Sequence, residues 1–208
     1  MNDLELTELV VKTIADTAIE NETFFCELDS VVGDGDFGYS LARGFEKLLE
    51  NWDYIDRSSV PMFLQKCAMI LTSRIGGSSG PIWGTAFMRA SAVARQHESL
   101  DASVLVAMIR SAIEGIQARG GAEFGDKTLI DVLAPMADEI EAASGLSGKQ
   151  IAERVAVRAD EAAEATKEII AKRGRASYTA ERSIGSVDAG GKGVAVITRA
   201  LADAWPEP

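Results

Sequence analysis

Helical periodicity runs through nearly the whole chain, and this feature restricts the fold more than any other. In the first stretch, apolar and threonine side chains recur every three or four residues, at Leu6, Leu9, Val10, Thr13, Ile14 and Thr17. This spacing places them on one face of a helix. No segment shows the sustained alternation of apolar and polar residues that is typical of a half-buried strand. The sequence therefore predicts an all-α protein.

Seven further helices are expected. The second follows an acidic segment and carries Leu41, Phe45, Leu48 and Leu49 on one face. The others are predicted at about residues 60–75, 81–96, 101–118, 128–143, 147–173 and 192–205. Ser147 and Gln150 form a capping box that begins the long seventh helix. Eight antiparallel helices with short connections are typical of an up-and-down bundle or helical barrel.

Four glycine-rich connections stand out between these helices. They are VVGDGDFGYS (31–40), GGSSGPIWGT (76–85), GGAEFGDKT (120–128) and GRASYTAERSIGSVDAGGKG (174–193). In an up-and-down array, every second connection lies at the same end of the molecule. These four follow the first, third, fifth and seventh helices, so we expect them to converge on one rim.

The acidic loop combines glycines with carboxylates. Residues 33–38 match the dinucleotide pattern G-x-G-x-x-G, but that motif needs a preceding strand and amides free to meet a pyrophosphate. Here a helical pattern precedes the loop, and two carboxylates would repel phosphate. Asp29, Asp34 and Asp36 instead suit a magnesium ion, because Mg²⁺ prefers hard oxygen ligands. The alternative is an acidic loop whose aspartates only cap the helix that starts near Gly38.

The segment at 76–85 has two readings that local sequence does not separate. Ser78, Ser79 and the adjacent amides could bind phosphate oxygens at a helix N-terminus. They could equally form a turn and an N-cap, with Pro81 in the first helical turn.

The last two loops carry charged residues. The segment at 120–128 resembles a P-loop, but Asp126 interrupts the Walker A pattern and a helix precedes it, so that motif is rejected. Lys172 and Arg173 lie at the predicted end of the seventh helix, where cations compensate the helix dipole. Arg175 lies beyond that end and is the better phosphate ligand.

Composition limits the partners and the chemistry. The chain has 208 residues, 47% of them hydrophobic, which is enough for one core and predicts a single domain over residues 1–208. The net charge of −11 opposes binding to nucleic acid or to anionic membranes. There is no membrane-spanning run or signal peptide, and two cysteines suit reduced thiols in the cytoplasm. The only histidine, His97, lies in a polar stretch, which weakens triad or zinc mechanisms but leaves phosphoryl transfer open.

The four loops, in this order, resemble those of the L subunit of bacterial dihydroxyacetone kinases, the nucleotide-binding component. The matching segments are LDSVVGDGDFGYSLARGF, GGSSGPIWGT, GAEFGDKTLIDVLAP and GRASYTAERSIGSVDAGG. The resemblance covers nearly the whole chain, and its last segment is very specific. The length matches the free-standing subunit and not a fused kinase.

This resemblance implies a barrel of eight antiparallel helices with ADP or ATP at one rim. It implies that Asp29, Asp34 and Asp36 hold two magnesium ions that bridge the phosphates, and that Arg175 assists catalysis beside them. The implied nucleotide contacts are Phe37, Gly38, Tyr39, Ser40, Ser78, Ser79, Gly120, Leu129, Arg175, Asp188, Ala189 and Gly190. The ketone is expected on a histidine of a separate K subunit, which fits the single histidine here.

The chain departs from the family pattern at three positions. Phe37 stands where some members have histidine, Ser40 where some have asparagine, and Ala189 where proline is usual. The metal ligands are intact, but the phosphoryl donor stays open. In one branch of the family a phosphotransferase-system protein rephosphorylates bound ADP, and in the other ATP exchanges as a substrate. The acceptor could also be a related short ketose such as erythrulose.

Two functions from other classes stay open at this stage. The chain could be a nucleotide-loaded regulator that binds a transcription factor without turnover. It could also be a helical magnesium-dependent phosphohydrolase that acts alone.

Overall fold

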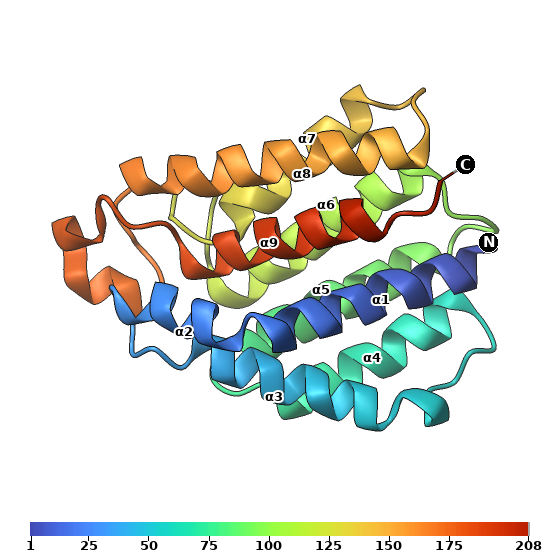
Figure 1. Cartoon of the computed structure of the whole chain (residues 1–208), viewed down its shortest axis with the longest axis horizontal. Helices are drawn as coiled ribbons and strands as arrows, with labels where there is room; N and C mark the ends of the chain where they lie inside the picture. Colours follow the sequence, from blue (N-terminus) through green and yellow to red (C-terminus); the bar gives the residue numbers. More distant parts are fainter. Residues whose placement is uncertain (208) are drawn as a thin grey trace.

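The computed structural model describes residues 1–207, which form nine α-helices and three short 3₁₀-helices and contain no strand (Figure 1). The α-helices are α1 (Asp3–Glu20), α2 (Glu22–Ser30), α3 (Phe37–Glu50), α4 (Val60–Arg74), α5 (Ser79–Ala94), α6 (Ala102–Gly120), α7 (Ile130–Ala142), α8 (Gly148–Ala165) and α9 (Ala189–Ala204). The 3₁₀-helices are η1 (Trp52–Tyr54), η2 (Thr166–Glu168) and η3 (Arg175–Ser183). The prediction of an all-α fold is confirmed.

Eight of the α-helices form a closed ring. From α3 to α9 each helix packs on the next, and α1 packs on both α3 and α9, which closes the ring. The remaining helix, α2, lies at one end of the molecule and packs against α3 and α9 (Figure 1). The eight ring helices correspond to the eight predicted from the sequence, and α2 is additional.

Side-chain caps start several ring helices, and one of these caps was predicted from the sequence. The predicted capping box of α8 is present, with Ser147 and Gln150 bonding to each other's backbone N–H groups. Asn2 and Glu5 form a second capping box at α1. Asp101 caps α6 by accepting the Val104 N–H at 2.9 Å. These bonds satisfy N–H groups that have no partner within the helix.

The helix α2 was missed because its sequence, ETFFCELDS, has only one fully buried side chain. That side chain, Phe25, contacts the ring of Phe37 with 5.8 Å between centroids. Asn21 separates α2 from α1, since both its N–H and its side-chain amide bond back to the Thr17 carbonyl. With so short a buried face, the helical spacing was too weak to recognise.

The predicted extent of the seventh helix, to about Arg173, was wrong. The corresponding helix α8 ends at Ala165, and the chain is extended by Ile169. The buried Thr166 hydroxyl bonds to the Ala163 carbonyl and accepts the N–H of Asp188 at 2.8 Å. This side chain turns the backbone away from the helix and ties it to the start of α9.

The hydrophobic interior has two main parts. One lies among α1 to α5 and contains the rings of Phe25, Phe45 and Phe63. The other lies among α6 to α9 and is built from smaller side chains such as Val132, Ile140 and Val155. The two parts correspond to the lower and upper layers of Figure 1.

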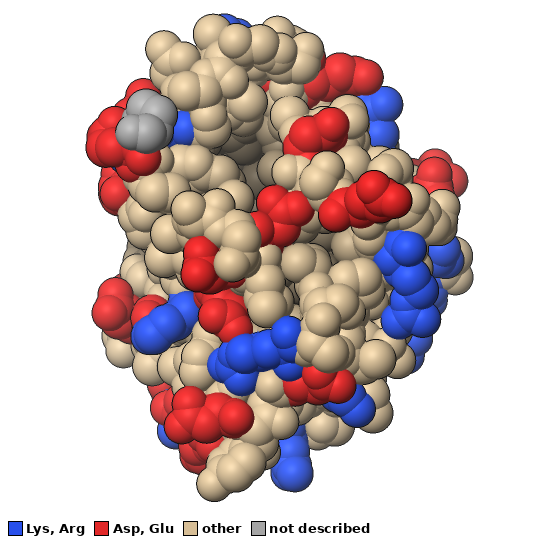
Figure 2. Space-filling model, turned by 90° about the vertical axis from the view of Figure 1, so that its right-hand side faces the viewer, with Lys and Arg blue, Asp and Glu red and all other residues tan. Residues whose placement is uncertain are grey.

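The two ends of the ring differ. One end carries both termini, and there acidic and basic side chains are interspersed (Figure 2). The other end, here named the site rim, carries the connections before α3, α5, α7 and α9, at residues 31–36, 75–78, 121–129 and 166–188. The convergence of the four glycine-rich loops is thus confirmed. None of the described helices is long and apolar enough to cross a membrane.

Candidate functional site

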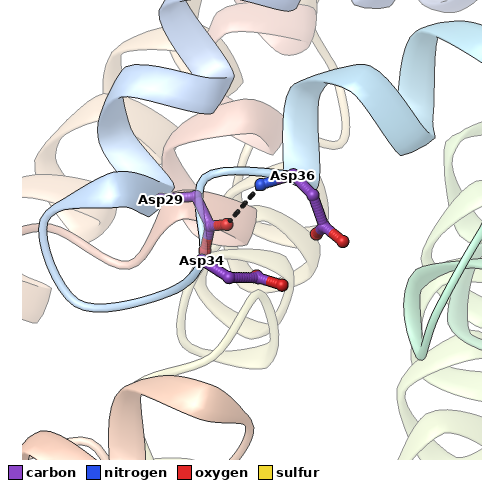
Figure 3. A group of neighbouring side chains, drawn as sticks. All are labelled: Asp29, Asp34 and Asp36. Atoms are coloured by element: carbon purple, nitrogen blue, oxygen red, sulfur yellow. Dashed lines mark hydrogen bonds between the residues drawn. The ribbon is translucent and has the colours of Figure 1, made fainter.

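Three carboxylates gather at the site rim. Asp29 lies in the last turn of α2, Asp34 in the loop that follows, and Asp36 at the N-cap of α3. One oxygen of each lies within 4.8 Å of the other two. In Figure 3 the carboxylates of Asp34 and Asp36 point to the same side of the loop. The alternative role of helix cap does not hold for Asp36, whose side chain makes no capping bond.

Asp29 organises the loop between α2 and α3. Its Oδ2 accepts the backbone N–H groups of Gly35 at 2.9 Å, Asp36 at 3.1 Å and Phe37 at 3.4 Å. Its carbonyl also accepts the Gly33 N–H at 2.6 Å, which closes the turn after α2. A carboxylate that collects several N–H groups fixes the backbone of a loop strongly, because these bonds are charge-assisted.

Two glycines allow the close approach of α2 to this loop and to α3. A Cβ on Gly33 would clash with the Asp29 carboxylate, and one on buried Gly38 would clash with the Glu22 carbonyl. The structure thus gives Gly38, expected as a nucleotide contact, a packing role between α2 and α3. The bond of the Tyr39 N–H to the Cys26 Sγ, at 3.2 Å, joins the same two helices.

Arg175 is the cation at the cluster. It lies at the start of η3, far from α2 in sequence, and its Nη1 lies 2.5 Å from Asp34 Oδ2. Its side chain is 64% exposed. Partial burial and the charge of Asp34 raise the pKa of the Asp36 carboxyl, while Arg175 lowers it and Asp29 raises it. The site therefore has more negative than positive charge.

The residues after the cluster have different surroundings. Phe37 is half-buried, against Phe25. Tyr39 is 54% exposed and lies under the Arg43 guanidinium. The Ser40 hydroxyl lies beside the backbone of Gly76, which connects the acidic loop to the start of α5. Of these three side chains, only that of Tyr39 is exposed.

The start of α5 is an open helix N-terminus. Ser78 occupies the N-cap position without a side-chain capping bond, and Ser79 is the first helical residue. Ser78 is exposed and Ser79 half-buried. Uncapped N–H groups at a helix N-terminus favour phosphate oxygens. The phosphate reading of this segment is consistent with that geometry.

The start of α9 lies beside the start of α7. Asp188 caps α9 by accepting the Gly191 N–H at 2.6 Å, and Ala189 and Gly190 form its first turn. Gly190 approaches Leu129, the N-cap residue of α7. Burial raises the pKa of Asp188 to about 7, with the Gly191 N–H opposing the shift and Asp131 and Asp29 adding to it.

Gly120 ends α6, directly before the connection 121–129 of the site rim. It is the exposed last residue of α6, and Gly121 follows it in the left-handed conformation, with φ of 62°. Within residues 1–207 no hydrogen bond or ion pair of its own joins it to the acidic loop.

A buried hydrogen-bond network, which was not predicted from the sequence, supports the loops of the site rim. Lys127 is 2% exposed, and its Nζ donates to the carbonyls of Ile169, Ser183 and Ser186. Its three bonds confirm that it is no Walker lysine. Asp131 accepts the N–H of Thr128 at 2.7 Å and thereby shapes the loop before α7. The sequence GDKTLID (125–131) could have indicated this network. It places three charged residues at the start of a buried helix, and buried charges need partners.

Lys172 and Arg173 do not compensate a helix dipole, so that prediction was wrong. Since α8 ends at Ala165, both lie in a non-helical segment and pair with the buried Asp126. The Arg173 Nε lies 2.9 Å from Asp126 Oδ2, and the Lys172 N–H bonds to the Asp126 carbonyl at 3.0 Å. These bonds and those of Lys127 hold residues 169–187, here named the cap segment, against the loop before α7.

The donor set suits a divalent cation. Carboxylate oxygens are the hard ligands that magnesium takes, and a cation would relieve the repulsion that helps to raise the pKa of Asp36. Beside them lie an arginine and an uncapped helix N-terminus, which both recognise phosphate. The arrangement can therefore hold a metal-bound polyphosphate at the site rim.

Comparison with known proteins identifies close relatives. The model of the DAK2 domain matches residues 31–203. The ADP-binding subunit DhaL of the PEP-dependent dihydroxyacetone kinase of Escherichia coli (strain K12) is 38% identical over 182 residues, which cover 86% of this chain and 87% of the relative. The ADP-binding subunit DhaL of the PTS-dependent dihydroxyacetone kinase of Lactococcus lactis subsp. lactis is 36% identical, and the match covers 88% of each chain.

A solved structure shares the fold. The native form of the dihydroxyacetone kinase of C. freundii matches with a TM-score of 0.73 and 25% identity. The match covers 96% of this chain and 34% of that one, so this chain spans about a third of the larger kinase.

Proposed function

Because the chain belongs to the DAK2 domain family, we propose that it is the nucleotide-binding subunit of a kinase for dihydroxyacetone or a related short ketose. The observation that carries the proposal is the meeting of three carboxylates, Arg175 and the open N-terminus of α5 at one rim. The ring closure of α1 on α9 supports one nucleotide-binding domain over the chain.

Each group at the rim has a role in this proposal. Asp29, Asp34 and Asp36 hold magnesium, for which the family resemblance implies two ions. When bound, magnesium supplies positive charge that offsets the charge of the phosphate oxygens. The N–H groups at the start of α5, beside Ser78 and Ser79, donate to phosphate oxygens. Arg175 turns its planar guanidinium toward the transferred phosphoryl group.

Among residues 1–207, the site rim has groups that suit phosphate but no histidine that could fix the ketone. The only histidine, His97, is exposed in the connection between α5 and α6, at the end opposite the site rim. Transfer needs the ketose hydroxyl to be held in line with the phosphoryl group. We therefore propose that a separate K-type subunit binds the ketose and docks on the site rim.

The names of the relatives support one phosphoryl donor over another. The Escherichia coli relative is named PEP-dependent and the Lactococcus lactis relative PTS-dependent, and both are named ADP-binding. We propose that ADP stays bound to this chain and that a phosphotransferase-system protein rephosphorylates it. ADP that survives dialysis of the purified protein supports this route, and ready exchange with ATP contradicts it.

A coupled assay for ketose phosphate tests the division of labour. The isolated chain should bind magnesium nucleotide without phosphorylating dihydroxyacetone, and adding a K-type subunit should restore turnover. Ser79→Arg should abolish that turnover without unfolding the ring. Turnover by the chain alone would place the ketose site here. Release of free phosphate without a ketose would favour a phosphohydrolase, and a nucleotide-loaded chain inactive with every K-type subunit would favour a regulator.

A further inference from the structure

The strongest unexplained feature of the rim is the pairing of Arg175 with Asp34. The function above needs Arg175 to face phosphate, but here its Nη1 lies 2.5 Å from a carboxylate of the metal cluster. The same Asp34 carboxylate is one of the three whose oxygens lie within 4.8 Å of each other. Arg175 therefore sits where a bound cation would repel it.

The three carboxylates are not held equally. Asp29 accepts three backbone N–H groups and is fixed by them. Asp34 has Arg175 as its ion-pair partner. Arg175 thus offsets part of the negative charge of the cluster, as a divalent ion would.

The cap segment gives Arg175 room to move. Lys127 holds the backbone at Ile169, Ser183 and Ser186, at both ends of the cap segment. Between these anchors, Arg175 lies at the start of η3 with most of its side chain exposed. An exposed ion pair is held weakly, so a divalent ion can displace it without disturbing the anchors.

We propose that Arg175 is an exchangeable placeholder cation: it pairs with Asp34 in the metal-free protein, leaves when metal binds, and then turns to the phosphates. This inference rests on the proposed function and adds a regulation of the same site. According to this proposal, Arg175 competes with a free metal ion for Asp34, but it contacts the phosphates when the metal–nucleotide complex is bound. Removing its charge must therefore change the two affinities in opposite directions.

The test compares Arg175→Gln with Arg182→Gln in the full chain. Arg182 is an exposed arginine of the same 3₁₀-helix, without an ion pair among residues 1–207, so the control removes the same charge. Binding of Mn²⁺ alone is measured by electron paramagnetic resonance, and binding of magnesium-ADP by calorimetry. Arg175→Gln should bind Mn²⁺ about two- to fivefold more tightly. It should bind magnesium-ADP about ten- to a hundredfold more weakly.

Hydrogen exchange gives a second readout that needs no catalysis. In the wild type, metal alone should speed exchange at residues 174–183, because Arg175 is released, and magnesium-ADP should slow it. Arg175→Gln should show no acceleration by metal alone. Unchanged or weaker Mn²⁺ binding in Arg175→Gln would overturn the placeholder role while leaving the kinase proposal intact. Failure of the wild type to bind Mn²⁺ would overturn both.

Discussion

Two substitutions with the same charge change should have different effects on the stability of the metal-free protein. Asp29→Asn weakens the acceptor of three backbone N–H groups, whereas Asp36→Asn removes a carboxylate that makes no capping bond. Both remove a ligand from the cluster, so both should weaken binding of magnesium. We expect Asp29→Asn to destabilise the metal-free fold and Asp36→Asn to leave it as stable as the wild type or more stable.

The magnitude for Asp29→Asn follows from its hydrogen bonds. Two are short, at 2.9 and 3.1 Å, and the third is long, at 3.4 Å. A charge-assisted bond is roughly twice as strong as a neutral one, so weakening two of them should cost about 1–2 kcal/mol. In a chain of this size that corresponds to a fall of about 2–8 °C in Tm.

The sign for Asp36→Asn follows from its pKa. The pKa of this carboxyl is raised in the folded protein, so its ionised form opposes folding at neutral pH. Asparagine removes that penalty, and the benefit should disappear as the pH falls through the ordinary carboxyl range, where Asp36 is protonated in the unfolded chain as well.

Thermal unfolding in EDTA at pH 7.5 measures the stability of the metal-free variants. Calorimetry with magnesium and ADP measures their affinity for magnesium-ADP. Both variants should bind magnesium-ADP more weakly, by about 2–4 kcal/mol for the loss of a charged ligand. An equal fall in Tm for both variants would refute the distinct roles of the two carboxylates. Unchanged magnesium-ADP affinity in either variant would remove that residue from the metal site.

Three further predictions concern the groups that support the site. Lys127→Met leaves three backbone carbonyls without their donor and should cost about 3 kcal/mol or more in urea unfolding; a loss below about 1 kcal/mol would contradict this. Gly38→Ala places a Cβ against the Glu22 carbonyl and should cost about 1–3 kcal/mol, whereas a silent variant would show that α2 shifts freely. Burial raises the pKa of Asp188 to about 7, from 3.8, so its carboxylate costs stability above pH 7 and this cost fades as the pH falls toward 4. The stability of Asp188→Asn relative to wild type should therefore be greatest near pH 8 and decline by pH 5 in metal-free buffer, and a pH-independent difference would count against it.

The ring could be predicted because its helices bury long apolar faces. Their spacing and caps are local properties, so eight helices and the common end of four loops follow from the sequence alone. The two wrong predictions have different physical causes. The helix α2 buries a single side chain fully, Phe25, and α8 ends early because the Thr166 hydroxyl bonds to Asp188 across the rim. A tertiary bond of this kind leaves no periodic signal.

The metal cluster was predictable for a different reason. Asp29, Asp34 and Asp36 lie within eight residues of one another, so a turn at the glycines sufficed to bring them together. The contacts of Lys127 and Arg173 span more than 40 residues, with carbonyls or a carboxylate as partners. Composition shows that such charges exist, but only the packing of the loops shows which partner each one finds.

The contacts that each carboxylate makes before metal binding determine which interactions the metal has to replace. Asp29 is already bonded to the loop, so binding does not have to order that segment. Asp36 is destabilised by its neighbours, so a cation gains from relieving it. Asp34 is occupied by Arg175, and this pair is the one contact that has to break. Because the released guanidinium then has no carboxylate partner at the cluster, the phosphates become its best remaining partner, and metal binding should favour nucleotide binding.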